Sequence, residues 1–273
     1  MRTVHATRYV TPLREGGSLP AIVEGDDDGL YVLKFVGAGQ GPRALIAELV
    51  AGEIGRALGL PVPEIVFATI DADLARTEPD AEIQDLIRAS ARRLVHASAE
   101  RADGAPATNL ALDYLPGAVA FDPLAFRPDA ELASRIVWFD AYLSNLDRTP
   151  RNANMLVWHD RLWLIDHGAA LYFHHDWNAM PEKASSPFAP IRDHILLPWA
   201  SDIHTAGEAA RSKLKREALS AILAQIPDAW LESLPGSLSA SERRDAYLSF
   251  FMYRLAAAHI FEQEATNART RFV

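Results

Sequence analysis

The hydrophobic and polar positions divide the chain into a strand-rich first part and a helical second part. Up to about residue 117, short apolar runs alternate with turns rich in glycine, proline and aspartate, a pattern typical of β-strands. We expect strands over residues 4–9, 21–23, 30–36 and 65–70, and one that begins at residue 109 and ends in a turn by 117. Beyond about residue 120, apolar residues recur mainly at helical spacing. The pattern predicts an α+β protein.

Helices interrupt and follow the strands. Residues 43–58 carry apolar side chains on one side, and Gly59 with the prolines after it is a stop signal. A second helix is expected over residues 77–93. Near the C-terminus, a capping box at residues 239–242 predicts one long last helix from 243 to about 267.

The most informative stretch predicts a helix, a loop and a hairpin in succession. The helix is expected to reach Leu146, because apolar residues recur at three- and four-residue spacing: Leu132, Ile136, Phe139, Leu143 and Leu146. The polar loop 147–154 follows, and Pro150 makes helix continuation unfavourable. Two short apolar runs, 155–158 and 162–165, are joined by a polar turn and predict a β-hairpin.

This helix–loop–hairpin unit carries a set of residues suited to phosphoryl transfer. Asp147 and Asp166 lie at its two ends, with Asn152 and Asn154 near the first. Any single aspartate here is explained equally well as a helix or turn cap. Together, however, one carboxylate suits an acceptor hydroxyl, and an asparagine and a second aspartate suit magnesium. We therefore assign Asp147 to the acceptor, Asn152 or Asn154 to the metal, and Asp166 to the metal.

A lysine inside an apolar strand is the next candidate. Lys34 lies within residues 30–36, where alternation alone makes it a solvent-facing position. The sequence Tyr-Val-Leu-Lys is also similar to the kinase strand whose lysine contacts nucleotide phosphates and pairs with a helix carboxylate. Glu48 and Glu53 on the helix 43–58 are the available carboxylates, and we expect Glu48 to be the partner.

The N-terminal part also contains a glycine pair. Gly16 and Gly17 lie in a polar turn between Arg14 and Ser18. An ordinary turn explains them, but backbone N–H groups of such a turn can also approach nucleotide phosphates, with Arg14 and Ser18 as further donors.

Composition and charge narrow the function. The 273 residues suffice for one large domain or two lobes, and 49% hydrophobic and 23% charged residues are ordinary for a soluble protein. The net charge of −9 argues against direct nucleic-acid binding as the main task. The chain has no cysteine, which excludes disulfides and thiolate metal sites. No apolar run approaches the ~18 residues of a membrane span, and no signal-peptide apolar region opens the chain, so we expect a cytoplasmic protein without a membrane partner.

Taken in order, these motifs resemble those of the HipA-like branch of the protein-kinase-like fold. Asp147 to Asn152 has the D-x-x-x-x-N spacing of kinase catalytic loops, with Asn145 in place of the usual His-Arg, and Asp166-His-Gly is similar to D-F-G. The helix 43–58 ends on Leu-Gly-Leu-Pro-Val-Pro, which is also similar to this family. The resemblance extends from about residue 8 to 265.

The resemblance implies a bilobed fold, a nucleotide and a reaction. A small β-rich lobe with one main helix would comprise residues 1–117, and a mostly helical lobe residues 118–273. ATP and Mg²⁺ would be used to phosphorylate Ser or Thr of a protein. Asp113, Tyr114 and Leu115 would occupy the hinge position and bind the adenine edge. Arg148 or Arg151 would neutralise the transferring group or brace the fold.

Other functions stay open at this point. A small-molecule or lipid kinase on the same fold is the second hypothesis, because an N-x-D loop suits non-protein acceptors. A nucleotide-binding pseudokinase module that acts by protein contact is the third. The phosphoacceptor itself is not readable from the sequence. The chain is shorter than full HipA toxins and we expect no counterpart of their extra N-terminal subdomain, so antitoxin association stays open.

Overall fold

The protein consists of two compact units, each assembled from separate stretches of the sequence. The computed structural model describes residues 1–13, 19–38, 41–91, 107–177 and 180–272. The first unit spans Met1–Leu49, Pro63–Pro116 and Gln225–Ala240, and the second spans Val50–Val62, Gly117–Ala224 and Ser241–Val273. Two short stretches, 50–62 and 225–240, therefore group differently from what a single boundary near residue 117 assigns.

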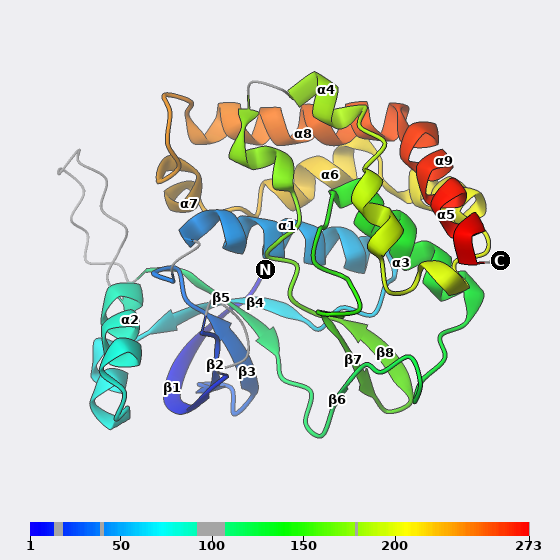
Figure 1. Ribbon diagram of the computed structural model, residues 1–273. Coiled ribbons are helices and arrows are strands. Elements are labelled where there is room, and N and C mark those ends of the chain that lie inside the picture. The colour runs from blue at the N-terminus through cyan, green and yellow to red at the C-terminus, as the bar shows by residue number, and fades with distance from the viewer. Residues whose placement is uncertain (14–18, 39–40, 92–106, 178–179, 273) are drawn as a thin grey trace. The chain divides into compact units, whose positions relative to one another are not determined.

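A closed five-stranded barrel forms the main part of the first unit (Figure 1). Its strands are β1 (Thr3–Pro12), β2 (Ala21–Gly25), β3 (Leu30–Lys34), β4 (Ile65–Ile70) and β5 (Asn109–Asp113). Around the barrel the order is β1-β2-β3-β5-β4; β1 and β4 pair in parallel, and the other pairs are antiparallel. The predicted strands are confirmed. Strand β1 is longer than expected, and its second half was not apparent in the sequence because in β1 only Val4 and Ala6 are buried.

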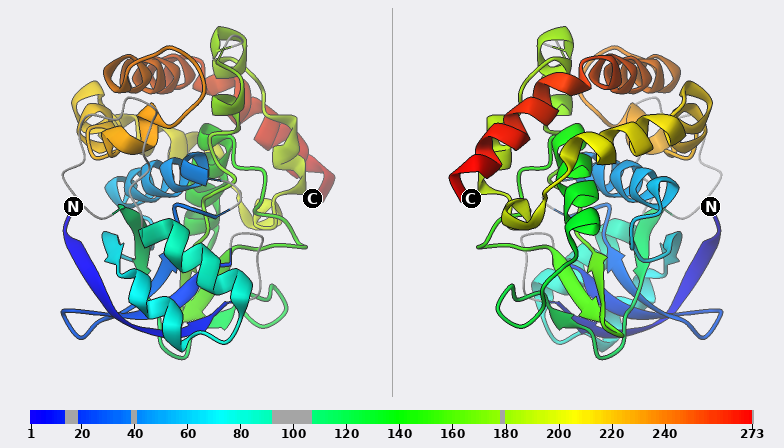
Figure 2. Two further views of the ribbon diagram at one scale, coloured as in Figure 1. Left: turned by 90° about the vertical axis from the view of Figure 1, so that its left-hand side faces the viewer. Right: turned by 90° about the vertical axis from the view of Figure 1, so that its right-hand side faces the viewer.

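The barrel interior is filled by apolar side chains, and a helix packs against it. Ile83 and Ile87 of α2 (Ala81–Ala91) belong to the same buried cluster as Val23, Leu33 and Val66 of the strands. Figures 1 and 2 show α2 beside the barrel. Burial of such side chains is the main favourable contribution to folding, at about 1.5–3 kcal/mol each.

The single helix predicted over residues 77–93 is wrong at its start. A 3₁₀ helix, η1 (Ala72–Thr77), comes first, and α2 begins only at Ala81. Between them Glu78 has an extended backbone, with φ −90° and ψ 123°. Proline at position 79 disfavours the helical conformation of the residue before it, and this separates the two helices.

Helix α1 (Gly41–Leu58) has the predicted bounds to within two residues and contributes to both units. Gly59 ends it with φ +75°, a conformation that glycine adopts without strain. Its last carbonyls are bound by side chains from the second unit's own helices. Arg135 Nη2 donates to Leu58 O and Gly59 O, and Lys213 Nζ donates to Leu58 O.

Helix α3 (Ala130–Leu143) is the central helix of the second unit. Almost every side chain from Ala133 to Leu143 is buried. The remaining helices of this unit are α4 (Met180–Ala184), α5 (Ile203–Lys213), α6 (Arg216–Leu223), α8 (Ala240–Ala256) and α9 (Ala258–Arg269). The short α7 (Asp228–Glu232) belongs to the first unit, where Trp230 Nε1 donates to Thr108 O.

The predicted hairpin is confirmed as part of a three-stranded sheet. The strands β6 (Val119–Ala120), β7 (Met155–Trp158) and β8 (Arg161–Leu164) pair in that order and are antiparallel. His159 and Asp160 form the turn, with φ +49° and +55°. Two successive left-handed residues match the turn type that a right-twisted two-residue hairpin favours.

Two helix predictions in the second unit are corrected. Helix α3 ends at Leu143, not Leu146, because Ser144 is left-handed with φ 52° and its N–H bonds back to Asp140 O and Ala141 O. The long last helix is broken at Ala257, so α8 and α9 are separate. Periodicity missed both breaks, since neither is marked by glycine or proline.

A buried arginine connects the end of α3 to α4. The Arg254 guanidinium on α8 donates to the carbonyls of Ala141 and Tyr142 and to those of Lys183, Ala184 and Ser186. Burial lowers the pKa of Arg254 to about 10, which leaves it charged at neutral pH. None of the helices in the described part of the chain combines the length and apolar character of a membrane span.

Candidate active site

A buried ion pair joins β3 to α1 in the first unit. Lys34 Nζ lies 2.5 Å from Glu48 Oε2, and the side chains are 11% and 0% exposed. Glu53, the other candidate, instead pairs with Arg56 at 3.3 Å on the helix surface. Lys34 is therefore not the solvent-facing residue of an alternating strand, and its ammonium is oriented by a carboxylate from α1.

Polar side chains also hold the chain where it leaves β3. Asn109 is fully buried; its Oδ1 accepts from Val36 N–H at 2.9 Å and its Nδ2 donates to Ser90 O at 3.1 Å. Ser90 Oγ accepts from Gly37 N–H at 3.1 Å. A Cβ added at Gly37 would lie 2.8 Å from that oxygen, so only glycine fits without displacement. The connection between Lys34 and α1 is thus tied to β5 and α2.

The second group of residues follows helix α3. After the left-handed Ser144, the Asn145 side chain turns back: its Nδ2 donates to Asp140 Oδ1 at 2.8 Å, and its Oδ1 accepts from Asp147 N–H at 3.2 Å. The next residues form a tight turn, in which Thr149 and Asn152 exchange backbone hydrogen bonds. The chain then enters β7 directly after Asn154.

The structure joins Asp147, Asn152 and Asn154 in one hydrogen-bonded group that extends to the backbone carbonyl of Asp166. Asp147 Oδ2 accepts from Asn152 Nδ2 at 2.8 Å and from Asn154 Nδ2 at 3.3 Å. Asn154 Nδ2 also lies 3.0 Å from Asp147 O and 3.5 Å from Asp166 O. Asn154 is buried and left-handed with φ 46°, and Asp166 has φ 55°. Asn152 is exposed.

This donor set fits a divalent cation. Because both amide nitrogens are directed at Asp147, each asparagine keeps its Oδ1 as an acceptor, and carboxylate and amide oxygens are the ligands that Mg²⁺ prefers. Within the described residues, no cluster of three His, Cys, Asp or Glu side chains could hold a metal. A magnesium site here would therefore depend on amide ligands beside Asp166.

Beneath the loop lies a buried charge cluster that sequence reasoning did not assign. Arg148 Nε donates to Asp140 Oδ2 at 2.6 Å, and His194 Nε2 donates to the same oxygen at 2.9 Å. Arg148 Nη1 donates to Asn154 O at 2.5 Å. All three side chains are buried, so Arg148 braces the fold and does not face a transferring phosphoryl group. The available signal was an aspartate within the apolar run 136–143 of α3.

The pKa values of this cluster follow from burial and charge. Burial alone would raise the pKa of Asp140, but the charge of Arg148 and the hydrogen bond from His194 outweigh it and hold this pKa well below its usual range. Burial lowers the pKa of His194, although Asp140 acts in the opposite direction. His194 Nδ1 accepts from Leu196 N–H at 3.0 Å, which assigns the proton of the neutral ring to Nε2.

The other predicted nucleotide contacts fall on residues 14–18 and 113–115. Arg14, Gly16, Gly17 and Ser18 lie outside the described residues. At the end of β5, Asp113 N–H donates to Glu64 O and Tyr114 N–H donates to Leu30 O, at 2.8 and 2.9 Å. These two N–H groups are engaged within the barrel and are therefore not available for the predicted adenine contact.

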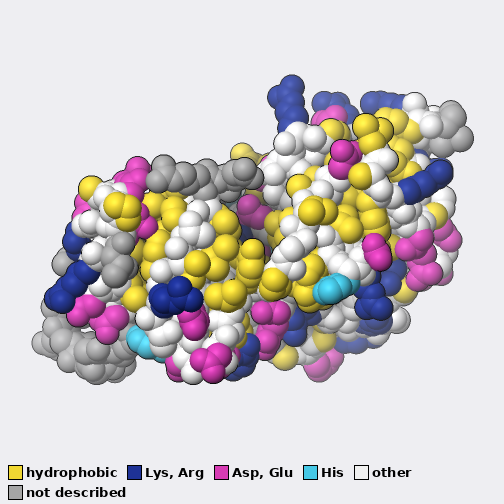
Figure 3. Space-filling view, turned by 90° about the horizontal axis from the view of Figure 1, so that it is seen from below, with side chains coloured by type: hydrophobic (Ala, Val, Ile, Leu, Met, Phe, Trp, Pro, Cys, Tyr) yellow, Lys and Arg dark blue, Asp and Glu magenta, His cyan; other side chains and the backbone are white. Residues whose placement is uncertain are grey.

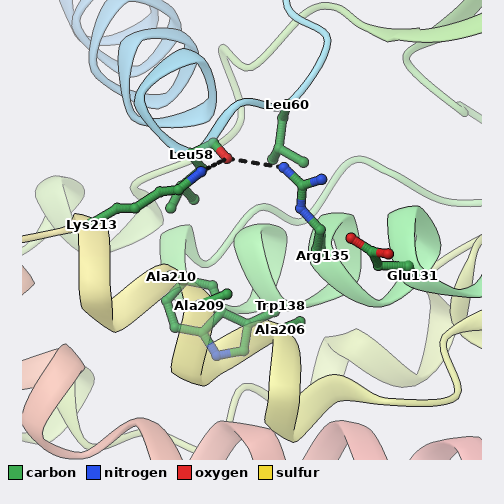
Figure 4. A pocket seen from close by; sticks show the side chains of 9 residues that line it. All are labelled: Leu58, Leu60, Glu131, Arg135, Trp138, Ala206, Ala209, Ala210 and Lys213. Carbon is green, nitrogen blue, oxygen red and sulfur yellow. Dashed lines mark hydrogen bonds between the residues drawn. The ribbon is translucent and has the colours of Figure 1, made fainter.

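A cavity in the second unit lies outside this set of residues. It has a volume of about 210 Å³ and is lined by Leu58, Leu60, Glu131, Arg135, Trp138, Ala206, Ala209, Ala210 and Lys213 (Figure 4). Its two cations, Arg135 and Lys213, both donate to Leu58 O at the end of α1. They cap the helix C-terminus, so the cavity has a structural explanation and includes none of the predicted site residues.

These observations indicate the class of protein to which the chain belongs. A small barrel with a strand lysine held by a helix glutamate, and a helical unit with two aspartates on a helix–loop–hairpin, belong to the kinase-like folds. A solved structure supports this class: the proinflammatory kinase CtkA of Helicobacter pylori is similar over 97% of this chain and 98% of that chain, with a TM-score of 0.53 and 13% sequence identity. At this identity the likeness shows the fold alone, and it confirms the predicted α+β, kinase-like architecture.

The chain belongs to the HipA-like kinase family. The model of this family matches residues 7–264, which confirms the family resemblance and identifies the protein as a member of a phosphotransferase family. No curated protein matches the sequence.

The Lys34–Glu48 pair leads to a prediction about stability. Because each charge is desolvated, Lys34→Met should lower the unfolding free energy by about 3–5 kcal/mol, and Glu48→Leu by a similar amount. The double variant should lose much less than the sum. Urea unfolding of the four proteins measures the coupling energy. The same cycle on the exposed Asp73–Arg76 pair is the control, with about 0.2–1 kcal/mol expected; equal coupling in both cycles would contradict the prediction.

The buried imidazole leads to a prediction about pH. Because burial lowers the pKa of His194, the unfolded chain takes up a proton at higher pH than the folded protein. The stability associated with this group is complete above about pH 6.5 and decreases as the pH falls below it. His194→Gln keeps an N–H donor for Asp140 and should reduce the slope of unfolding free energy against pH below about 6.5. His259→Gln, at an exposed histidine, is the control for the loss of one imidazole. A slope in His194→Gln equal to that of the wild-type protein would refute the assignment.

Proposed function

We propose that the protein is an ATP- and Mg²⁺-dependent protein kinase that phosphorylates Ser or Thr. The observation that carries the proposal is the hydrogen-bonded group of Asp147, Asn152, Asn154 and Asp166 on one helix–loop–hairpin unit. Membership in the family supports phosphotransferase activity. That the acceptor is a protein is our proposal. A filled set of catalytic positions favours an active enzyme over a pseudokinase module.

The first unit would bind the nucleotide phosphates through Lys34. An ammonium that is buried and held at 2.5 Å by Glu48 has lost most of its rotational freedom before the nucleotide arrives. Such preorganisation lowers the entropic cost of binding and of reaching the transition state. Leu115 would contribute its N–H to the adenine edge, and the sequence prediction of phosphate contacts by Gly16 and Gly17 falls on residues outside the described ranges.

The second unit would supply the metal ligands and the base. Bound by Asp166 and Asn154, Mg²⁺ would neutralise charge on the phosphates. We assign Asn154 to the metal because its Nδ2 is tied to Asp147 and Asp166 while its Oδ1 remains an acceptor. We assign Asn152 to orienting Asp147, since its Nδ2 donates to the Oδ2 of that carboxylate.

Asp147 would act on the acceptor. Its carboxylate accepts a hydrogen bond from the Ser or Thr hydroxyl and takes the proton as the oxygen attacks the γ-phosphorus. The bond from that phosphorus to the bridging oxygen breaks and ADP leaves. Because the transition state is loose, most of the acceleration comes from positioning and from charge stabilisation.

The charge of the chain supports a protein acceptor over a nucleic acid. The net charge is −9, and on the face drawn in Figure 3 acidic and basic side chains lie interspersed. A nucleic-acid partner selects instead for lysine and arginine gathered into one basic surface.

The decisive test is transfer of label from γ-labelled ATP. With magnesium and a cell lysate, the wild-type protein should label itself or a lysate protein on Ser or Thr. Asp147→Ala should lower transfer by at least about 100-fold, because the general base is lost, while nucleotide binding is retained. The exposed Asp245→Ala on α8 is the control. Label confined to small molecules would favour a small-molecule kinase, and equal transfer by Asp147→Ala would refute the assigned loop.

The two asparagines make a separate prediction about metal. Asn154→Ala should raise the Mg²⁺ concentration at half-maximal activity by more than about tenfold, because a ligand is removed. Asn152→Ala should lower kcat while leaving this concentration within about twofold, since only the orientation of Asp147 changes. Binding of Mn²⁺ in the presence of a non-hydrolysable ATP analogue, followed by electron paramagnetic resonance, measures the metal directly. The opposite ranking of the two variants would exchange their roles.

A further inference from the structure

Three polar side chains converge on one buried carboxylate at the end of α3. Asp140 Oδ1 accepts from Asn145, and Oδ2 accepts from Arg148 and from His194, at 2.8, 2.6 and 2.9 Å. Asp140 is 0% exposed, so its side chain has no route to solvent or to a substrate. Its effect on chemistry must act through the groups that it binds.

Two of these side chains also form hydrogen bonds with the backbone of the proposed catalytic loop. Asn145, held by Asp140 through Nδ2, uses its Oδ1 to accept from the backbone N–H of Asp147. Arg148, held through Nε, uses Nη1 to donate to the backbone carbonyl of Asn154. One branch therefore reaches the proposed base and the other reaches the proposed metal ligand.

The Asn154 branch acts on a strained backbone. Asn154 has φ 46°, a left-handed conformation that is uncommon outside glycine and that asparagine adopts more readily than most residues. Such conformations persist only where surrounding contacts impose them. Arg148 Nη1 and the N–H of Ile165 both donate to Asn154 O, and the arginine is the charged donor of the two.

We propose that Asp140 is a positioning residue that, through Asn145 and Arg148, holds Asp147 and Asn154 in their reactive arrangement. The kinetic consequence rests on the proposed function, whereas the two branches themselves are a property of the fold. Stability alone does not account for the cluster, because apolar residues of similar volume are often as stable as a buried ion pair. Apolar residues, however, have no donor or acceptor for the loop backbone.

The test uses Arg148→Lys, which keeps the charge beside Asp140 but has a single nitrogen. A lysine ammonium lacks the planar fork needed to reach Asp140 and Asn154 O together. Arg135→Lys is the control, because Arg135 lies on α3, the helix that carries Asp140, and donates to the carbonyls of Leu58 and Gly59 outside the loop. Asn145→Ala interrupts the other branch and leaves the Asp140–Arg148 pair intact.

The first readout is hydrogen exchange by NMR and needs no enzymatic activity. In Arg148→Lys, the backbone of Asn154 loses the charge-assisted hydrogen bond that holds its side chain against Asp147. The side-chain amide of Asn154 should therefore exchange faster by about tenfold or more, while that of Asn145 is unchanged. In Asn145→Ala, the Asp147 N–H should exchange faster and the Asn154 amide should not. General destabilisation would accelerate both branches in both variants, and that result would overturn the proposal.

The second readout is kinetic. Arg148→Lys should lower kcat by about 100-fold, because small displacements of reacting groups are that costly, with KM for ATP within about twofold of wild type. Its Mg²⁺ requirement should rise, and Arg135→Lys should match wild type. Wild-type kcat in Arg148→Lys would overturn the proposal. If the wild-type protein transfers no phosphate, the proposed function fails, and the exchange experiment still decides whether the two branches hold the loop.

Discussion

A carboxylate that cannot reach water must be surrounded by donors, and in this protein that constraint organises the loop after α3. Asp140 is fully buried in α3, and its oxygens accept from Asn145, Arg148 and His194. Removing any donor would leave part of a buried charge unsatisfied, which is among the most destabilising changes a fold can undergo. The loop 145–154 and the segment around His194 are therefore fixed to the helix by electrostatics that cannot relax by hydration.

A second buried carboxylate, in the first unit, is likewise paired with a cation. There the buried carboxylate is Glu48 on α1, and its partner Lys34 extends from β3. A lysine ammonium is a compact charge whose burial is costly, and the Glu48 carboxylate compensates that cost. Arg148, by contrast, is buried between Asp140 and the Asn154 carbonyl and has a structural role.

Helix capping explains the cations that line the cavity of the second unit. Arg135 and Lys213 line a cavity, yet both donate to Leu58 O at the C-terminus of α1, where cations are favoured by the helix dipole. Arg254 satisfies carbonyls at the ends of α3 and α4 in the same way. Cationic side chains at helix C-termini are thus a repeated device in this fold, separate from the site that carries the proposed reaction.

The sequence by itself determined the family, the strands, helix α1 and the identity of the candidate site residues. Those features depend on local periodicity and on motif spacing, which are encoded within short stretches: the apolar strand around Lys34, the loop from Asp147 to Asn154, and Asp166 after the hairpin. Helix ends without glycine or proline, at Ser144 and Ala257, were missed for the same reason. Only the tertiary structure decided that Glu48 and not Glu53 meets Lys34, and that Asp140, Arg148 and His194 form one cluster. His194 lies 54 residues from Asp140 in the chain, and no local pattern specifies which distant donor a buried charge will find.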